Sequence, residues 1–183
     1  TCIFIIFNAS KVHASAGLYH LRFDQHGNGT NGGGSYYNGD KAWFDNHNGM
    51  TAEGAVTSIQ WSHEDQDEEN YYEGYFTPPT TGTYTFYLWS DNIGSVVIDD
   101  VDFIAPVDVG ALTAAMSMNA GQPYKISIYQ GDSGGPEELD FAWHGGSQPP
   151  WTRNLASYFT TQNPNLNNEG YLIERVILDG AFN

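Results

Sequence analysis

The chain has 183 residues, which is enough for one domain with a sizeable core. Six Lys and Arg stand against 22 Asp and Glu, giving a formal net charge of −16. Such a surface repels nucleic acid and anionic lipid, so neither is an expected partner, and it attracts divalent cations. The same acidity is also typical of an extracellular protein that only has to stay soluble. No segment approaches the roughly 20 apolar residues of a membrane helix, so membrane insertion is not expected.

The first 16 residues carry an apolar run, Cys2-Ile3-Phe4-Ile5-Ile6-Phe7. Such a run is typical of the end of a signal peptide or of a strand buried on both faces. Leaving six such side chains in water costs on the order of 10 kcal/mol. We therefore expect Ile3, Phe4, Ile5, Ile6 and Phe7 to pack on their own domain or to complete the sheet of a second copy of the chain. A head-to-tail contact of the second kind would build a filament.

The N-terminal half also contains the only cysteine, two glycosylation sequences and a region rich in Gly, Asn and His. The single cysteine, Cys2, excludes an internal disulfide. Asn8-Ala9-Ser10 and Asn28-Gly29-Thr30 have the sequence of N-glycosylation sites, which favours a secreted protein with glycans on Asn8 and Asn28. Residues 24–54 are rich in Gly, Asn and His and predict a long ordered loop region.

From residue 74 onward, side-chain types alternate from one residue to the next, as they do in strands. Only residues 111–118 approach the period of a helix. Clusters of Gly, Pro, Asn and Asp separate the alternating stretches, and short strands at this spacing predict an antiparallel all-β sandwich. The predicted strands are 84–89, 95–98, 124–129, 139–143 and 172–178, and the predicted turns are 78–82, 91–94, 120–123 and 131–136.

The segment Gly131-Asp132-Ser133-Gly134-Gly135-Pro136 matches the loop around the nucleophile of chymotrypsin-like serine proteases. A serine hydroxyl needs a histidine base and an orienting carboxylate. None of the six histidines has the sequence setting of that family, and Tyr129-Gln130 stands where its cysteine would be. Six residues of this composition also form an ordinary turn between two strands. We therefore do not expect an enzyme.

Four stretches in order resemble the protective-antigen-fourteen (PA-fourteen) domain family, which occurs in flocculin-type and bacterial adhesins. They are Glu73–Phe86, Trp89-Ser90-Asp91-Asn92-Ile93-Gly94 with the strand to Asp100, Gly121–Tyr129, and Gly134–Trp143. The resemblance implies a β-sandwich over about residues 17–160, with an N-terminal strand extension in 1–16 and a C-terminal strand extension in 161–183.

The resemblance also implies a ligand site. In the sugar-binding members, two adjacent Asp residues joined by a cis peptide bond hold a Ca²⁺ ion, which ligates sugar hydroxyls. Asp91 and Asn92 occupy those positions here, so an amide oxygen replaces one carboxylate. Asp132 would complete the metal site, and Ser133 and Gly134 would contact the sugar. The alternative is that Asp91 and Asn92 cap a tight turn.

Tryptophans are the remaining candidates for sugar contact. Trp43, Trp61 and Trp151 would either stack on sugar rings or fill the core, and core packing is the first interpretation for each. Trp151 is the one kept as a candidate ligand-binding residue. We thus expect a secreted or cell-surface adhesion module that binds glycans with Ca²⁺. The alternative function is a structural subunit of an extracellular filament made of copies of the chain, and a serine hydrolase comes third.

Overall fold

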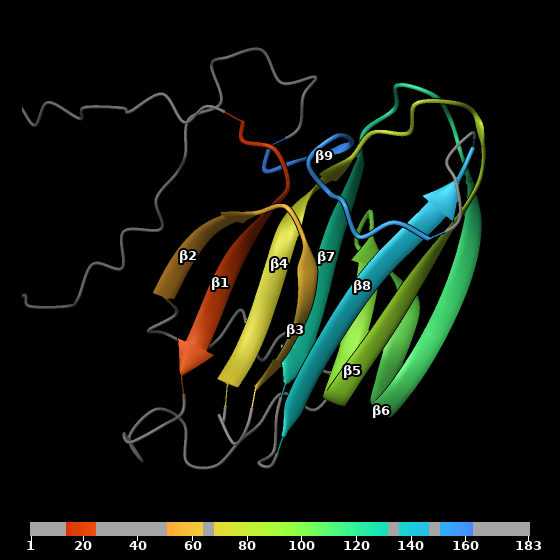
Figure 1. Ribbon diagram of the computed structural model, residues 1–183. Coiled ribbons are helices and arrows are strands. Elements are labelled where there is room, and N and C mark those ends of the chain that lie inside the picture. The colour runs from red at the N-terminus through yellow and green to blue at the C-terminus, as the bar shows by residue number, and fades with distance from the viewer. Residues whose placement is uncertain (1–13, 25–50, 64–67, 132–135, 147–150, 163–183) are drawn as a thin grey trace, which may run out of the picture.

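The computed structural model describes residues 14–24, 51–63, 68–131, 136–146 and 151–162 (Figure 1). Over these residues the chain is all-β and antiparallel, without a helix, as the alternation predicted. The described part contains no helix that is long and apolar enough to cross a membrane. The predicted strands at 3–7 and 172–178 and both glycosylation sequons lie outside the described residues. The strands are β1 (Leu18–Asp24), β2 (Thr51–Val56), β3 (Ile59–His63), β4 (Glu68–Phe76), β5 (Gly82–Ile98), β6 (Val101–Met118), β7 (Tyr124–Gly131), β8 (Glu137–Gly145) and β9 (Phe159–Thr160).

The strands follow the order β2-β1-β4-β7-β5-β8-β3, with β6 beside β5 and β9 beside β4. The first half of β5, Tyr84–Asp91, pairs with β8, and the second half, from Ile93 to Ile98, pairs with β7. β6 pairs with both halves, so β8 and β7 occupy the opposite edge of β5 one after the other. The sheet therefore divides along β5 into two layers, one with β3 and β8 and one with β7, β4, β1 and β2 (Figure 1).

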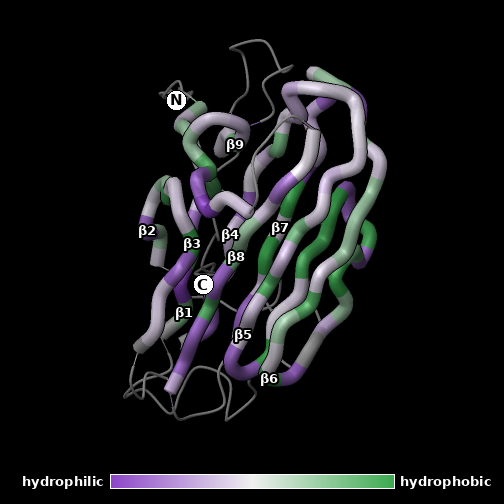
Figure 2. The backbone as a smooth tube through the Cα atoms, turned by 45° about the vertical axis from the view of Figure 1, so that its right-hand side comes forward, coloured by the Kyte–Doolittle hydropathy of each residue, from purple (hydrophilic) through white to green (hydrophobic). Residues whose placement is uncertain are grey.

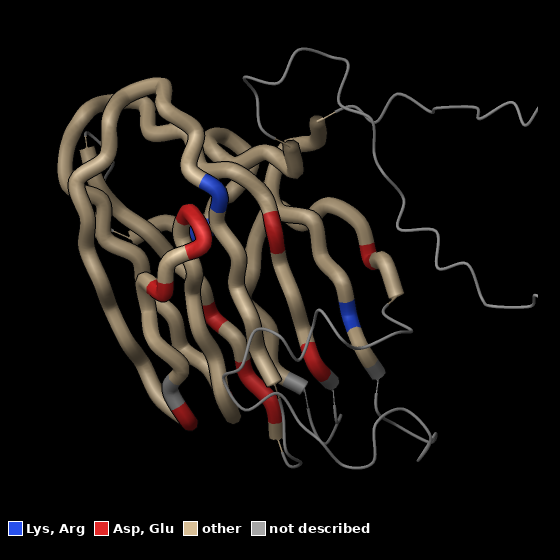
Figure 3. The backbone as a smooth tube through the Cα atoms, turned by 180° about the vertical axis from the view of Figure 1, so that it is seen from behind, with Lys and Arg blue, Asp and Glu red and all other residues tan. Residues whose placement is uncertain are grey.

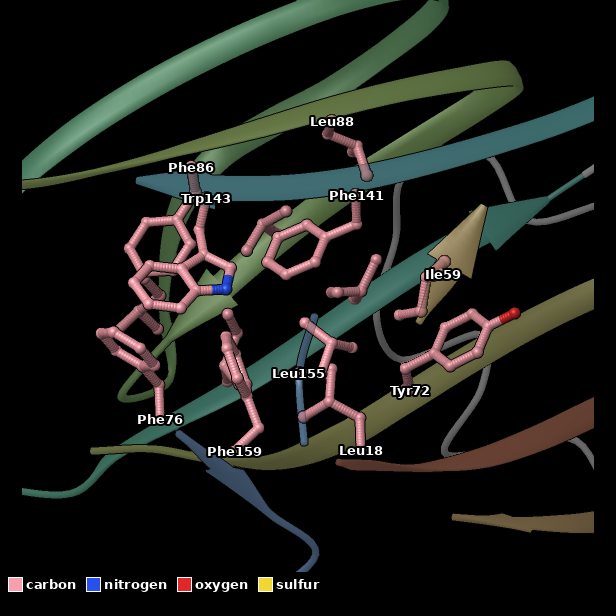
Figure 4. Packing of buried hydrophobic residues seen from close by; sticks show 14 of the residues in the cluster. Leu18, Ile59, Tyr72, Phe76, Phe86, Leu88, Phe141, Trp143, Leu155 and Phe159 are labelled. Atoms are coloured by element: carbon pink, nitrogen blue, oxygen red, sulfur yellow. The ribbon is translucent and has the colours of Figure 1, made fainter. Parts of the chain in front are cut away.

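Aromatic side chains from both layers form the core (Figure 4). Phe76 of β4 packs edge-on against Trp143 of β8 at 5.0 Å and against Phe86 of β5 at 5.5 Å between ring centroids. Burial of each such side chain stabilises the fold by roughly 1.5–3 kcal/mol. Every second residue of β5 from Tyr84 to Ser90 is buried. Figure 2 shows hydrophobic and hydrophilic positions interspersed along the strands.

The structure differs from the predicted strand boundaries in three places. Residues 84–89 and 95–98 belong to one strand, β5, because the predicted turn at 91–94 is a local irregularity inside it. Residues 111–118, which approached a helical period, form the end of β6, an edge strand with mostly exposed side chains. The predicted loop region 24–54 contains the end of β1 at Asp24 and the start of β2 at Thr51.

Candidate functional site

Asp91 and Asn92 lie where β5 leaves one layer and enters the other. Asp91 is opposite Glu138 of β8, and Ile93 is opposite Gly131 of β7. The two residues therefore stand between the end of β7 and the start of β8, next to both ends of the connection between them. The peptide bond between Asp91 and Asn92 is cis, as the family resemblance implies for this pair.

The backbone is irregular on both strands of the β5–β6 ribbon at this point. Two residues of β5 separate the paired Ser90 and Ile93, whereas one residue of β6, Val109, separates their partners Gly110 and Asp108. This extra residue makes a β-bulge. Val109 has φ of 39°, a left-handed conformation that a β-branched residue rarely adopts. Such outliers gather at functional sites.

A chain of buried amides holds the Asp91 backbone in place. Gln130 Nε2 donates to the Asp91 carbonyl oxygen at 3.2 Å, and Asn70 Nδ2 donates to Gln130 Oε1 at 2.8 Å. Asn70 Oδ1 then lies 2.8 Å from Nε2 of His20, and the acceptor role of this oxygen makes that nitrogen the donor. His20 stacks on Tyr72 with ring centroids 4.2 Å apart. Gln130 of β7 and Asn70 of β4 are both buried. The Asp91 carbonyl is therefore hydrogen-bonded to buried side chains of the layer that contains β7 and β4.

The side chain of Asp91 is half-buried, and among the described residues no group donates a hydrogen bond to it or pairs with its charge. In particular, it accepts no bond from its own neighbouring backbone in this part of the chain, which a turn cap requires. Acidic residues surround the same end of the strands, where Glu138 is opposite Asp91 and Asp108 is opposite Ile93. Figure 3 shows several Asp and Glu positions at this end. Within the described ranges, no three His, Cys, Asp or Glu side chains converge as a metal would require.

The predicted partners from the β7–β8 connection, Asp132, Ser133 and Gly134, lie outside the described residues. Their flanking residues are placed: Gly131 is opposite both Ile93 and Glu69, and Glu137 is fully buried at the start of β8. The connection thus begins and ends beside Asp91 and Asn92. The catalytic interpretation of Ser133 falls on the same undescribed segment.

Trp151 is placed away from this site. Its ring packs edge-on against Tyr87 of β5 and His144 of β8, with centroid distances of 5.8 and 4.4 Å. Tyr87 precedes Asp91 by four residues, or about 13 Å of strand at about 3.3 Å per residue. Trp61, by contrast, packs on the core and donates its Nε1 hydrogen to the Tyr72 hydroxyl at 3.0 Å. Trp43 lies outside the described residues.

Sequence reasoning missed a hollow of about 200 Å³ on the outer face, lined by Tyr87, Ala142, Trp151 and Arg153. Arg153 Nε donates to Asp140 Oδ1 at 2.7 Å, and Arg153 Nη2 donates to Asp140 Oδ2. These hydrogen bonds raise the pKa of the Arg153 guanidinium. Burial and then the Asp140 charge raise the pKa of the Tyr87 hydroxyl. The only sequence signal was the presence of two aromatic residues, Tyr87 and Trp151, on separate segments that strand alternation alone does not bring together.

Comparison with known proteins identifies the family. The sequence model of the PA14 domain family matches residues 29–163, well over half of the chain. The chain belongs to the PA14 domain family. A search among curated proteins found none that matches.

Solved structures with the same fold include several PA14 domains. The A domain of Epithelial Adhesin 6 from Candida glabrata, solved with Galβ1-3GlcNAc, is 14% identical, with a TM-score of 0.59 over 84% of this chain and 90% of that one. The PA14 domain of the MpAFP antifreeze protein is 14% identical, with a TM-score of 0.66 over 86% and 97%. The PA14 sugar-binding domain of an RTX adhesin is 13% identical, with a TM-score of 0.63 over 80% and 99%.

Proposed function

We propose that this PA14 domain is a glycan-binding adhesion module that acts outside the cell or at its surface. In this proposal, Asp91, Asn92 and Asp132 hold a Ca²⁺ ion, and Ser133 and Gly134 contact the sugar. The observation that carries it is the position of the Asp91-Asn92 pair at the branch of β5, between the adjoining ends of β7 and β8. Relatives of the same fold include a sugar-binding domain of an adhesin and an adhesin domain in complex with a disaccharide.

The residues at the branch fit a calcium ion in kind. Ca²⁺ takes oxygen ligands from carboxylates, amide side chains and backbone carbonyls. Asp91 offers a half-buried carboxylate that no donor among the described residues occupies, and Asn92 follows it directly. The described residues contain no cluster of three acidic ligands, so Asp132 is a necessary part of the proposal. When bound, the ion would supply coordination positions for a pair of sugar hydroxyls.

Two features set expectations for affinity. Asn92 stands where the resemblance implies a second Asp, and calcium affinity follows the number of charged ligands. We therefore expect a Kd for Ca²⁺ toward the weak end, about 10⁻⁴–10⁻³ M, which extracellular modules use. The surrounding charge of Glu138 and Asp108 raises the local concentration of cations and favours this binding at low salt.

A glycan array tests the proposal. The full chain, carrying a fluorescent label, is applied in about 10 mM Ca²⁺, which is about tenfold above the upper end of the expected Kd, and again in excess EDTA. Binding to a defined set of glycans that disappears in EDTA and in Asp91→Ala supports the calcium-centred site. Binding that is unchanged in EDTA would contradict calcium dependence, and binding to no glycan under either condition would contradict the function itself.

A further inference from the structure

The outer face of β5 and β8 carries a row of side chains whose places follow from strand alternation. Thr85 is opposite His144, Tyr87 is opposite Ala142, and Trp89 is opposite Asp140. Neighbouring inward residues Phe86, Phe141 and Trp143 fill the core, so the first set faces outward. The short side chain of Ala142 therefore lies between bulkier neighbours on the outer side of the sheet.

A short segment after β8 walls this face on the side away from β5. Thr152 pairs with Trp143 through two backbone hydrogen bonds of 3.0 and 2.8 Å. Because Thr152 shares the register position of Trp143, its neighbours Trp151 and Arg153 take the opposite, outer face. Trp151 reaches His144 and Tyr87, and Arg153 reaches Asp140. The result is the hollow of about 200 Å³ over Ala142.

We propose that this hollow is a second glycan subsite, which binds one neutral pyranose ring without calcium. Its walls combine an aromatic surface with a fixed polar pair, the combination that small-ligand sites use for apolar contact and orientation. Trp151 is 41% exposed although the rings of Tyr87 and His144 pack steeply inclined to it. The C–H face of a pyranose is apolar and packs on such a ring, while its rim carries hydroxyls.

The Arg153–Asp140 pair supplies polar groups for those hydroxyls. The pair is bidentate, so both heads are already oriented and lose little freedom when a ligand arrives. Two of the five N–H donors of Arg153 serve Asp140, and the others have no acceptor among the described residues and remain for a ligand. The Asp140 side chain is 12% exposed and that of Arg153 is 40% exposed, so the guanidinium is the group that solvent and ligand reach.

Charge and size select the class of sugar. Arg153 is neutralised by Asp140, and the chain carries a net charge of −16, so an anionic sugar gains no attraction here. The hollow is smaller than the roughly 300–1,000 Å³ of sites that enclose drug-sized ligands. It therefore suits a single ring lying on the surface, with an expected Kd on the order of 1–10 mM. The subsite does not rest on the calcium site, because no residue is shared and the two lie about 13 Å of strand apart.

Nuclear magnetic resonance in EDTA tests this inference apart from the calcium site. The ¹⁵N-labelled chain is titrated with methyl β-D-galactopyranoside, methyl α-D-glucopyranoside and methyl α-D-mannopyranoside, with glucuronate as the charged counterpart. We expect at least one neutral pyranoside to shift the Trp151 indole N–H resonance saturably and glucuronate to bind at least several-fold more weakly. The Trp61 indole, which is bonded to Tyr72, is the internal control.

Three variants complete the test. Ala142→Leu fills the floor of the hollow and should abolish the shift, Arg153→Met should weaken binding at least fivefold, and Asp91→Asn should leave it unchanged. Because Ala142→Leu disturbs a tightly packed position, Arg153→Met at a partly exposed position keeps the test valid if the first variant fails to fold. No saturable shift with any of the three pyranosides up to about 100 mM would overturn the inference. So would equal binding by wild type and Arg153→Met, or occupation of the hollow by the chain's own residues.

Discussion

Replacement of Gln130 by methionine measures how firmly the Asp91 backbone is held. Gln130 is fully buried and connects Asn70 with the Asp91 carbonyl through bonds of 2.8 and 3.2 Å. Methionine has nearly the same length, no donor and only a weak thioether acceptor, so the Asp91 carbonyl loses its donor and Asn70 loses a strong acceptor. A buried group left unsatisfied costs about 1–3 kcal/mol. Since the Asp91 side of the contact is only half-buried, we expect a loss of about 2–4 kcal/mol in the free energy of unfolding.

The assay is urea unfolding at 25 °C, with the slope compared among variants to confirm two-state behaviour. Gln60→Met on the exposed side of β3 is the matched control and should change stability by less than about 0.5 kcal/mol. Adding Asn70→Leu to Gln130→Met removes the orphaned amide, so the double variant should be about 1–2 kcal/mol more stable than additivity predicts. A Gln130→Met loss as small as that of Gln60→Met, or strict additivity, would refute the proposed role of this chain of amides.

Three further predictions concern stability and assembly. Burial, followed by the Glu73 carboxylate that accepts its hydroxyl hydrogen, raises the pKa of Tyr71 above its usual 10.0. The unfolded chain therefore releases this proton first, and the free energy of unfolding should fall by about 1.4 kcal/mol per pH unit above pH 10. Between pH 9 and 11, the free energy of unfolding of Tyr71→Phe, measured in urea, should fall less steeply than that of the wild type by that amount. Equal slopes in the two proteins would refute the role of Tyr71. Val109→Asn should raise the unfolding free energy by about 0.5–1 kcal/mol, because Asn tolerates the left-handed conformation and Val109 is 49% exposed; a thermal melt showing a loss would refute the strain. If residues 3–7 complete a second copy's sheet, deletion of residues 1–10 should convert assemblies to monomers in ultracentrifugation, whereas assemblies that persist would exclude the donated strand.

Much of the fold was predictable because the outer and inner positions of the central strands alternate cleanly. Tyr84 to Trp89 and Leu139 to Trp143 show it in the sequence and lie in β5 and β8. The path of β5 between two layers was not predictable. Asp91 to Gly94 has the composition of a turn, and only the exchange of β8 for β7 as hydrogen-bond partner shows that the strand continues. That exchange depends on tertiary contacts, which local sequence does not encode.

The candidate sites, like the fold, could be predicted from the sequence only in part. The position of Asp91 and Asn92 came from a motif, because the residues are adjacent in sequence. The amide chain through Asn70 and Gln130 spans 60 residues, and no pattern connects the two. Residue type alone suggested Trp151 as a sugar contact, without indicating where it lies. The structure places it beside Tyr87, on the outer face of the sheet.

Calcium binding at Asp91 is the most direct test of the central claim. Isothermal titration calorimetry of the full chain at low salt should give one site in the range of about 10⁻⁴–10⁻³ M. Asp91→Asn and Asp100→Asn each remove one negative charge without changing size, and Asp100 is an exposed residue of the β5–β6 turn. We predict at least about tenfold weaker binding in Asp91→Asn, through loss of a charged ligand, and unchanged binding in Asp100→Asn. Absence of calcium uptake by the wild type, or equal weakening in both variants, would contradict the account.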